Sequence, residues 1–196
     1  MGAVKRLSKE ERKKEIMQSA AKVIIEKGFS KTTMEDIIAG TTMSKGGVYH
    51  YYGNTMDILA DLMISGMEYR NKVIFSHLDE YQKGCEVEFL AKQLVQKMID
   101  DNSYMPIYVQ FLIEKKRNPK LELLFQDLKK KALAEFSNIL KDDFNVFPDM
   151  ATFDFMTDFM NAIILASDVL DARESFATNR QLLEEMTVFV LKKIKR

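Results

Sequence analysis

Apolar residues recur at three- and four-residue spacing along almost the whole chain, and this periodicity constrains the fold most. Ile16, Ala20 and Ile24 share one face of a predicted helix, and the stretch 89–98 has the same spacing. No segment alternates apolar and polar residues over the length of a strand, and no Asn-Gly hairpin turn occurs. The pattern therefore predicts an all-α protein of about nine helices.

Capping signals indicate where these helices begin and end. Ser8 and Glu11 have the spacing of a capping box, and Gly28 follows the last turn of the same helix. Thr33 can cap a short second helix, and Ser44 can cap a third. The remaining helices are expected over about 55–82 and 86–101, from Pro106, from Pro119, from Pro148 to about 171, and from Thr178 or Asn179 to about 194.

Composition narrows the class of protein. Hydrophobic residues make up 46% of the 196 residues and charged residues 30%, which is typical of a globular chain. The longest uncharged run, 102–113, is too short to span a membrane. The N-terminal residues form no apolar signal region, so a cytoplasmic protein is expected. The single cysteine, Cys85, allows no internal disulfide. With only two histidines beside it, we expect neither a metal site nor a cofactor.

The charges are unevenly distributed, although 29 Lys and Arg balance 29 Asp and Glu. A net charge of zero on its own argues against nucleic-acid binding. Residues 1–60 nevertheless hold ten basic and seven acidic residues, a net charge of +3, whereas residues 61–196 carry −3. Several cations lie at the start of the chain: Lys5, Arg6, Lys9, Arg12, Lys13 and Lys14. Such a segment is either a solvated tail or an arm that contacts phosphates.

The segment 32–52, TTMEDIIAGTTMSKGGVYHYY, carries the clearest functional signal. A short amphipathic helix, a polar turn and a second short helix follow one another, which is the arrangement of a helix-turn-helix. In this motif the first residues of the second helix reach bases in the major groove. Gly46 and Gly47 would each destabilise that helix by about 1 kcal/mol relative to Ala, and they would let DNA approach the backbone.

The side chains around the two glycines suit the same role. Lys45 supplies a cation for phosphate or guanine, and Tyr49 and His50 offer hydrogen bonds. Val48 and Tyr52 are expected to face inward. The competing interpretation is a loop at the two glycines, with the tyrosines of residues 49–52 as core aromatics.

The stretches AAKVIIEKGFSKTTMEDII (20–38) and MSKGGVYHYYGNTMDIL (43–59) resemble the DNA-binding domain of the TetR family of bacterial transcriptional regulators. The likeness covers about a quarter of the chain. It implies an N-terminal three-helix DNA-binding domain with a basic arm, residues 1–55. A helical ligand-binding and dimerisation domain, residues 56–196, would follow.

The resemblance also implies DNA contacts. Thr33 would meet a phosphate, and Lys45, Gly47 and Tyr49 would face the groove. Ser44, Tyr49 and His50 would share phosphate contacts. The predicted DNA-binding residues are Thr33, Thr42, Ser44, Lys45, Gly46, Gly47, Tyr49 and His50.

The chain departs from the family pattern at two positions. The family commonly has Gly at the position of Thr42, so Thr42 would strain the turn, require a different closure, or add a phosphate contact. At Thr55 the family commonly has Lys, and one phosphate contact is missing there unless the N-terminal arm compensates.

Methionine and aromatic residues are frequent in the second domain, and most are expected to form its core. A few are expected to line a cavity for a small, largely hydrophobic effector, because Met side chains adapt to ligands. The candidates are Met63, Met67, Phe89, Met98, Tyr108, Phe111 and Phe125. No group of Arg or Lys stands out there to demand an anionic ligand.

The segments 153–170 and 182–191 are apolar on nearly every face, so they must be buried on several sides. They predict a homodimer in which four helices meet, with a two-fold axis suited to a palindrome-like operator. The interface candidates are Phe159, Ile163, Phe189 and Val190.

These features predict a ligand-responsive transcriptional regulator, foremost a repressor, that binds double-stranded operator DNA. An activator or architectural DNA-binding protein of the same fold stays open, as does a helical interaction protein that no longer binds DNA. An enzyme is not expected, because the sequence has no Gly-rich phosphate loop, nucleophile elbow or His-x-x-x-His pair.

Overall fold

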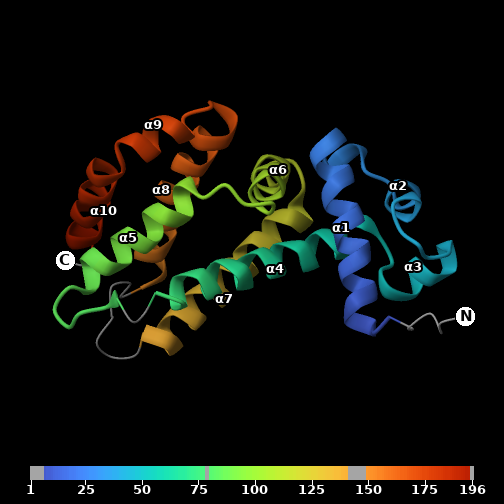
Figure 1. Ribbon diagram of the computed structural model, residues 1–196, viewed down its shortest axis with the longest axis horizontal. Coiled ribbons are helices and arrows are strands. Elements are labelled where there is room, and N and C mark those ends of the chain that lie inside the picture. The colour runs from blue at the N-terminus through green and yellow to red at the C-terminus, as the bar shows by residue number, and fades with distance from the viewer. Residues whose placement is uncertain (1–6, 78–79, 141–148, 195–196) are drawn as a thin grey trace, which may run out of the picture.

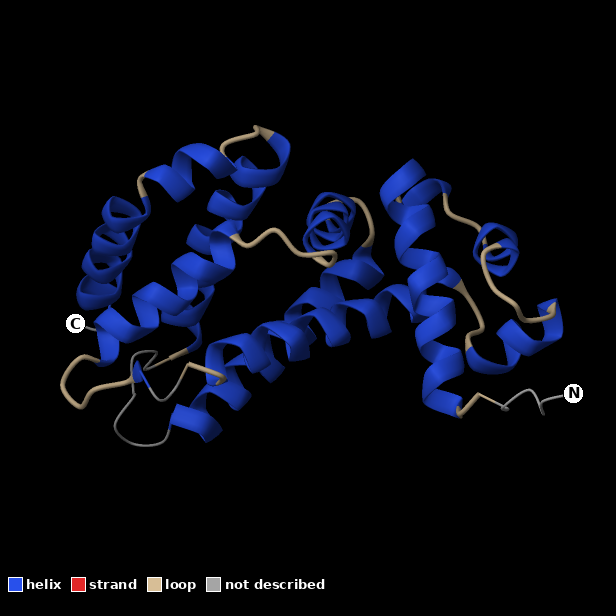
Figure 2. Ribbon diagram, viewed as in Figure 1, coloured by secondary structure: helices blue, strands red, loops and turns tan. Residues whose placement is uncertain are grey.

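The computed structural model describes residues 7–77, 80–140 and 149–194. Within these residues the chain forms ten α-helices and one 3₁₀ turn, Phe29–Lys31, and no strand (Figure 2). The prediction of an all-α fold is confirmed. The helices are α1 (Lys9–Lys27), α2 (Met34–Ala39), α3 (Lys45–Tyr51), α4 (Thr55–Phe75), α5 (Glu86–Ile99), α6 (Met105–Lys115), α7 (Pro119–Leu140), α8 (Met150–Val169), α9 (Arg173–Thr178) and α10 (Arg180–Ile194). None of them is long and apolar enough to cross a membrane.

Local capping fixes most helix starts where the sequence predicts them. The side chains of Ser8, Thr33 and Asn54 each accept a hydrogen bond from the backbone N–H three residues later. Gly28 ends α1 with a φ of 83°, a left-handed conformation that favours glycine, and its N–H donates to the carbonyl of Ile24.

Two elements differ from the sequence prediction. α4 ends at Phe75 and not near Gln82, and the hydroxyl of Ser76 donates to the carbonyl of Val73 at 2.8 Å, a local bond that competes with a further helical turn. The short α9 is additional, so the described residues contain ten helices and not nine. None of its residues is buried and no side chain caps it, so it leaves no periodic signal in the sequence.

The long α4 connects the two ends of the molecule (Figure 1). The helices α1, α2 and α3 lie at one end, whereas α5, α8, α9 and α10 lie at the other. Between them, α7 packs against α4, and α6 packs against α1 and α7. The first three helices are therefore held by direct packing and not by a free linker.

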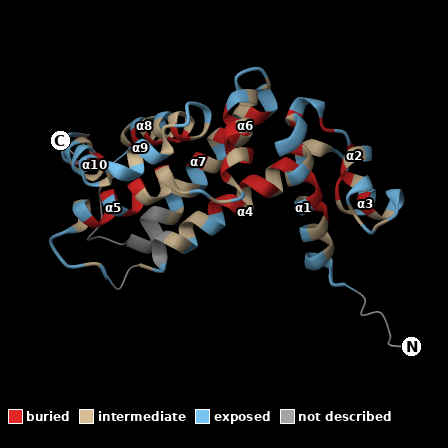
Figure 3. Cartoon of the chain, turned by 45° about the horizontal axis from the view of Figure 1, so that its top comes forward, coloured by how far each residue is buried: buried red, intermediate tan, exposed pale blue. Residues whose placement is uncertain are grey.

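Two hydrophobic clusters form the interior, which Figure 3 shows as buried segments on the inner faces of the helices. The first joins α1–α4 to α6 and α7, with Ile16, Leu59 and Phe111 among its fully buried members. The second joins α5, α8 and α10 through Leu90, Met156 and other residues. The first cluster continues across the domain boundary proposed at residues 55–56.

Gly40 allows α1 and α2 to approach closely. A Cβ at this position would clash with the hydroxyl oxygen of Ser19 and lie 3.1 Å from its Cβ. That buried hydroxyl donates to the carbonyl oxygen of Ile37 at 2.6 Å, so it cannot move aside without losing its bond. The close approach therefore requires glycine.

Replacing Gly40 by Ala is expected to lower the free energy of unfolding by about 1–3 kcal/mol, because the added methyl overpacks this contact. Denaturant unfolding followed by circular dichroism measures the change. In the double variant Gly40→Ala/Ser19→Ala the loss should be smaller than the sum of the single losses. Additive effects would contradict the proposed clash.

Candidate nucleic-acid interface

The helix α3 begins directly after Ser44, whose hydroxyl accepts a hydrogen bond from the N–H of Gly47 at 3.2 Å. Gly46 and Gly47 therefore lie in the first turn of a helix. The interpretation of this segment as a loop is wrong.

The inner face of α3 is held by Val48 and by Tyr52, which follows the helix; they are 0% and 3% exposed. Their predicted inward orientation is confirmed. The hydroxyl of Tyr52 donates to the carboxylate of Asp61 at 2.8 Å, and the ammonium of Lys13 lies 2.8 Å from the same carboxylate oxygen. Burial and this bond raise the pKa of Tyr52. Asp61 of α4 thus fixes both α1 and the end of α3.

The outer face of α3 carries Lys45, Gly46, Tyr49 and His50, all exposed. The ammonium of Lys45 lies 3.0 Å from the carboxylate of Glu35 in α2 and 5.8 Å from the centre of the Tyr49 ring. Its bond to Glu35 raises the pKa of Lys45. An exposed ion pair of this kind stabilises a protein little, so Lys45 can exchange Glu35 for a phosphate or a base.

The two glycines of α3 differ in their surroundings. A Cβ at Gly47 would lie 3.3 Å from the hydroxyl oxygen of Ser44 and 3.4 Å from Cε of Met43. A Cβ at Gly46 would meet no atom within 4 Å. The packing of the protein therefore gives no reason for glycine at position 46, whereas a partner that approaches the outer face of α3 would.

Thr33 is exposed at the start of α2, and its polar groups are already bonded. Its N–H donates to the carboxylate of Asp36 at 2.8 Å, and its hydroxyl contacts the same carboxylate. The ammonium of Lys27 also binds Asp36, and Lys27 and Thr33 together lower the pKa of that carboxyl to about 2. A phosphate at Thr33 would have to compete with Asp36 for these donors.

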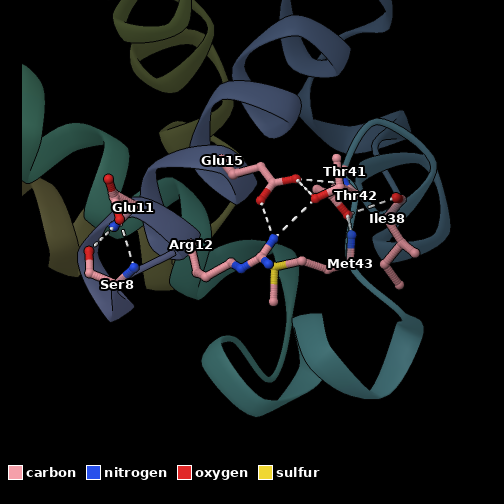
Figure 4. A network of polar contacts seen from close by, with 8 residues as sticks. All are labelled: Ser8, Glu11, Arg12, Glu15, Ile38, Thr41, Thr42 and Met43. Carbon is pink, nitrogen blue, oxygen red and sulfur yellow. Dashed lines mark hydrogen bonds and ion pairs between the residues drawn. The ribbon is translucent and has the colours of Figure 1, made fainter. Parts of the chain in front are cut away.

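Thr42 closes the turn between α2 and α3 through α1 (Figure 4). Its N–H and its hydroxyl each donate to Oε1 of Glu15 at 2.6 Å, and these bonds lower the pKa of Glu15. Arg12 lies 2.9 Å from Glu15 and 3.0 Å from the hydroxyl of Thr42. Among the non-glycine residues that the structure describes, only Asp171 has a positive φ, so Thr42 does not strain the turn. The turn is therefore closed by hydrogen bonds from Thr42 to Glu15 and not by the backbone conformation of a glycine. The hydroxyl of Thr42 is bonded within the protein.

The basic N-terminal segment is less free than its sequence suggests. Lys5 and Arg6 lie outside the described residues. Arg12 and Lys13 have carboxylate partners on α1 and α4, whereas Lys9 and Lys14 are exposed. Neither Glu15 nor Asp61 is among the predicted site residues. The spacing of three residues between Arg12 and Glu15 on one helix is a sequence signal for Glu15, whereas Asp61 has none.

A cavity of about 80 Å³ lies in the second part of the protein, bordered by α4, α5, α6, α7 and α8. Of the predicted pocket residues, Met63, Met67, Tyr108 and Phe125 line it. Phe89, Met98 and Phe111 do not line it, and they pack in the two hydrophobic clusters.

Two further lining residues, Arg70 and Lys97, were not predicted. Arg70 falls on the same helical face as Met63 and Met67, and Lys97 is one turn after Leu94. A cation on an apolar helical face is the sequence signal that could have identified each of them.

The predicted interface residues lie at the end of the molecule that holds α8 and α10. Phe189 is 63% exposed, and much of α10 is exposed in Figure 3. Phe159, Ile163 and Val190 are partly buried against the second hydrophobic cluster. Other exposed apolar residues on the two helices are Phe155, Val169, Leu182 and Met186.

Known proteins resemble this chain in sequence and in fold. Residues 16–62 match the family described as bacterial regulatory proteins, tetR family. The uncharacterized HTH-type transcriptional regulator YfiR of Bacillus subtilis is 22% identical over 134 residues, which cover 68% of this chain and 65% of that protein, slightly less than two thirds of its length. IcaR of Staphylococcus epidermidis, the HTH-type negative transcriptional regulator of the biofilm operon icaADBC, is 25% identical over 88% of this chain and 89% of its own.

A solved structure of Salmonella enterica GusR shares the fold, with a TM-score of 0.69, 18% identity, and coverage of 96% of this chain and 99% of that one. A helix-turn-helix whose second helix is capped and exposed is the arrangement found in DNA-binding regulators. The match of residues 16–62 and the two relatives identify the chain as a transcriptional regulator with a tetR-type N-terminal region.

Replacing Gly46 by Ala is expected to stabilise the protein by about 1 kcal/mol, because Ala favours a helix and the added methyl meets no neighbour. The same change is expected to weaken DNA binding, since the methyl stands on the surface that faces the groove. Thermal unfolding and fluorescence anisotropy with labelled DNA measure the two effects. A variant that gains stability and keeps its DNA affinity would contradict the role of the outer face.

Proposed function

We propose that this protein is a repressor that binds a palindrome-like operator as a homodimer and is controlled by a small, largely hydrophobic effector. Residues 1–55 would form the DNA-binding domain and residues 56–196 the effector-binding and dimerisation domain. IcaR, which resembles this chain over most of its length, is named a negative regulator, and this supports repression over activation.

The outer face of α3 is the observation that carries the proposal. Lys45 and Tyr49 extend from it, and Gly46 leaves the backbone open between them. None of these residues is buried in the core, whereas Val48 holds the helix from behind. A surface with a cation, an aromatic hydroxyl and an accessible backbone suits the major groove, where bases present both hydrogen-bond acceptors and apolar methyl groups.

Dimerisation is supported by the exposed apolar residues of α8 and α10. Leu182, Met186 and Phe189 follow one another at helical spacing on α10, and each is about half exposed or more. This row of large apolar side chains on α10, together with the exposed apolar residues of α8, favours burial against a second copy. Two recognition helices related by a two-fold axis would read two half-sites one turn of DNA apart.

The cavity supports control by an effector, because the helices around it also hold the DNA-binding end. Met63 of α4 belongs to the first hydrophobic cluster and lines the cavity, and Tyr108 of α6 does the same. A ligand that alters the cavity would therefore alter the packing beneath α1.

DNA fragments selected from a random pool by the purified protein should share a palindrome-like sequence, and their affinity should fall steeply with salt. Tyr49→Ala should weaken binding to the selected DNA by about 1–3 kcal/mol, because a groove contact is lost. Tyr69→Ala is the matched control, since Tyr69 in α4 is 39% exposed against 40% for Tyr49. Failure to enrich any sequence, or equal effects of the two changes, would contradict the proposal.

Phe189→Glu is expected to convert the dimer to a monomer at micromolar concentration, because the substitution places a charge in the apolar contact. Sedimentation velocity measures the molecular mass. Leu123→Glu on α7 provides the control, since Leu123 is 67% exposed and belongs to neither of the two proposed interface helices. A wild-type protein that sediments as a monomer would rule out the interface.

A further inference from the structure

The cavity combines apolar walls with three cations, of which Lys129 is paired with Asp154 and two have no acidic partner in the described residues. Its apolar lining comes from Met63, Met67, Leu94, Phe125, Met156 and Met160. Arg70 of α4 and Lys97 of α5 line the same space from two different helices, and both are partly buried. A purely hydrophobic effector would give these two charges no partner.

Arg70 has an aromatic neighbour but no acid. Its guanidinium carbon lies 4.8 Å from the centre of the Tyr108 ring, and burial lowers the pKa of Arg70. The hydroxyl of Tyr108 donates to Asn161 at 2.8 Å, which holds the ring in place. Among the described residues, no carboxylate forms an ion pair with Arg70.

Lys97 is also without a hydrogen-bonded or ion-paired neighbour in the described parts of the chain. Burial and the charge of Arg70 lower the pKa of Lys97 to about 7. Burying an unpaired cation is unfavourable, and burying two that repel each other is more so. Packing alone does not explain why both are present.

Two acids near the cavity already have partners. Asp154 of α8 lies 2.7 Å from the ammonium of Lys129, which also lines the cavity. The carboxylate of Glu135 binds the side-chain amide of Asn71. Burial and the charge of a third acid, Asp158 of α8, raise the pKa of Tyr108. None of the three acids forms an ion pair with Arg70 or Lys97, so the two charges remain for a ligand.

We propose that the effector is an amphipathic anion whose acidic head group binds between Arg70 and Lys97 and whose apolar part lies against the methionines and Phe125. The proposal rests on the proposed function, since it names the chemical class of that effector. A guanidinium suits a planar carboxylate or a phosphate, and the ammonium adds a second charge-assisted hydrogen bond. The head group replaces the missing acid, and the long apolar lining selects for a hydrocarbon body.

The position of Arg70 connects this binding to α4. In the empty cavity, Arg70 and Lys97 repel each other across the space between α4 and α5. An anion removes this repulsion and draws the two helices towards one charge, so the bound and empty states favour different positions of α4. Asp61, nine residues before Arg70 on α4, holds Tyr52 and Lys13 and carries such a shift to α3.

The test uses the full-length protein and three probe series of six, eight and ten carbons: alkyl carboxylates, alkyl phosphates and the corresponding neutral alcohols. Titration calorimetry should show at least one acidic series binding ten-fold or more tightly than the alcohols. Comparison of carboxylates with phosphates identifies the head group. Alcohols that bind as tightly as the acids, or acids that do not bind at any chain length, would overturn the proposal.

Arg70→Met and Lys97→Met should each reduce the affinity for the acidic probe at least ten-fold and leave alcohol binding unchanged. Both variants should melt at or above the wild-type temperature, because an unpaired buried cation is removed, so loss of binding does not reflect unfolding. Lys116→Met, an exposed change at the end of α6, is the control. Undiminished affinity in both cavity variants would refute the assignment of the two cations.

Operator binding separates this inference from the proposed function. In the absence of probe, the two cavity variants should still select the same DNA sequence as the wild type, while the acidic probe should change DNA affinity only in the wild type. If the wild type binds no DNA sequence specifically, the proposed function fails, whatever the calorimetry shows. If DNA binding is normal and the probes bind without regard to charge, only the assignment of an anionic effector fails.

Discussion

The packing of α1 against both α4 and α6 is the contact on which the rest of the structure depends. The short helices α2 and α3 have too few residues to be stable alone, and they fold onto α1 and the start of α4. The polar contacts of Glu15 with Thr42, and of Asp61 with Tyr52, then fix the turn and the end of the recognition helix. Because the same hydrophobic cluster extends into α6 and α7, the DNA-binding end cannot change its position without repacking part of the other domain.

The cations at the two ends of the molecule differ in whether a carboxylate lies beside them. Around the helix-turn-helix, Arg12, Lys13, Lys27 and Lys45 each have a carboxylate partner, so α3 is oriented before DNA arrives. In the cavity, Arg70 and Lys97 have no acid beside them in the described chain, and their burial lowers the stability of the empty protein. Natural proteins often carry such local instability where a ligand compensates for it.

The sequence predicts the fold and the identity of the recognition helix because both depend on local signals. Helical spacing, the caps at Ser8, Thr33 and Ser44, and the inward position of Val48 are all properties of neighbouring residues. The partners of Thr42 and Tyr52 are distant in sequence, and no local rule connects Glu15 to Thr42 across 27 positions.

The cavity is harder to predict from the sequence, because the residues that line it are also distant from one another along the chain. Met63, Met67 and Phe111 are equally plausible pocket candidates from the sequence. Met63 and Met67 line the cavity, whereas Phe111 does not and is fully buried in the first hydrophobic cluster. Arg70 and Lys97 are 27 residues apart on separate helices, so only tertiary packing shows that they share one space.

The length of α4 determines how strongly a small change at the cavity is felt at the DNA. From Arg70 to Thr55 the helix spans about 22 Å at about 1.5 Å per residue. A tilt of about 5° about the cavity end therefore displaces the start of α4, and α3 with it, by about 2 Å. In a symmetric pair both copies would move, so the separation of the two recognition helices would change by about one base-pair step, which is about 3.4 Å. Under the proposed function, the length of α4 would therefore convert a small tilt at the bound molecule into a mismatch with the spacing of the DNA half-sites.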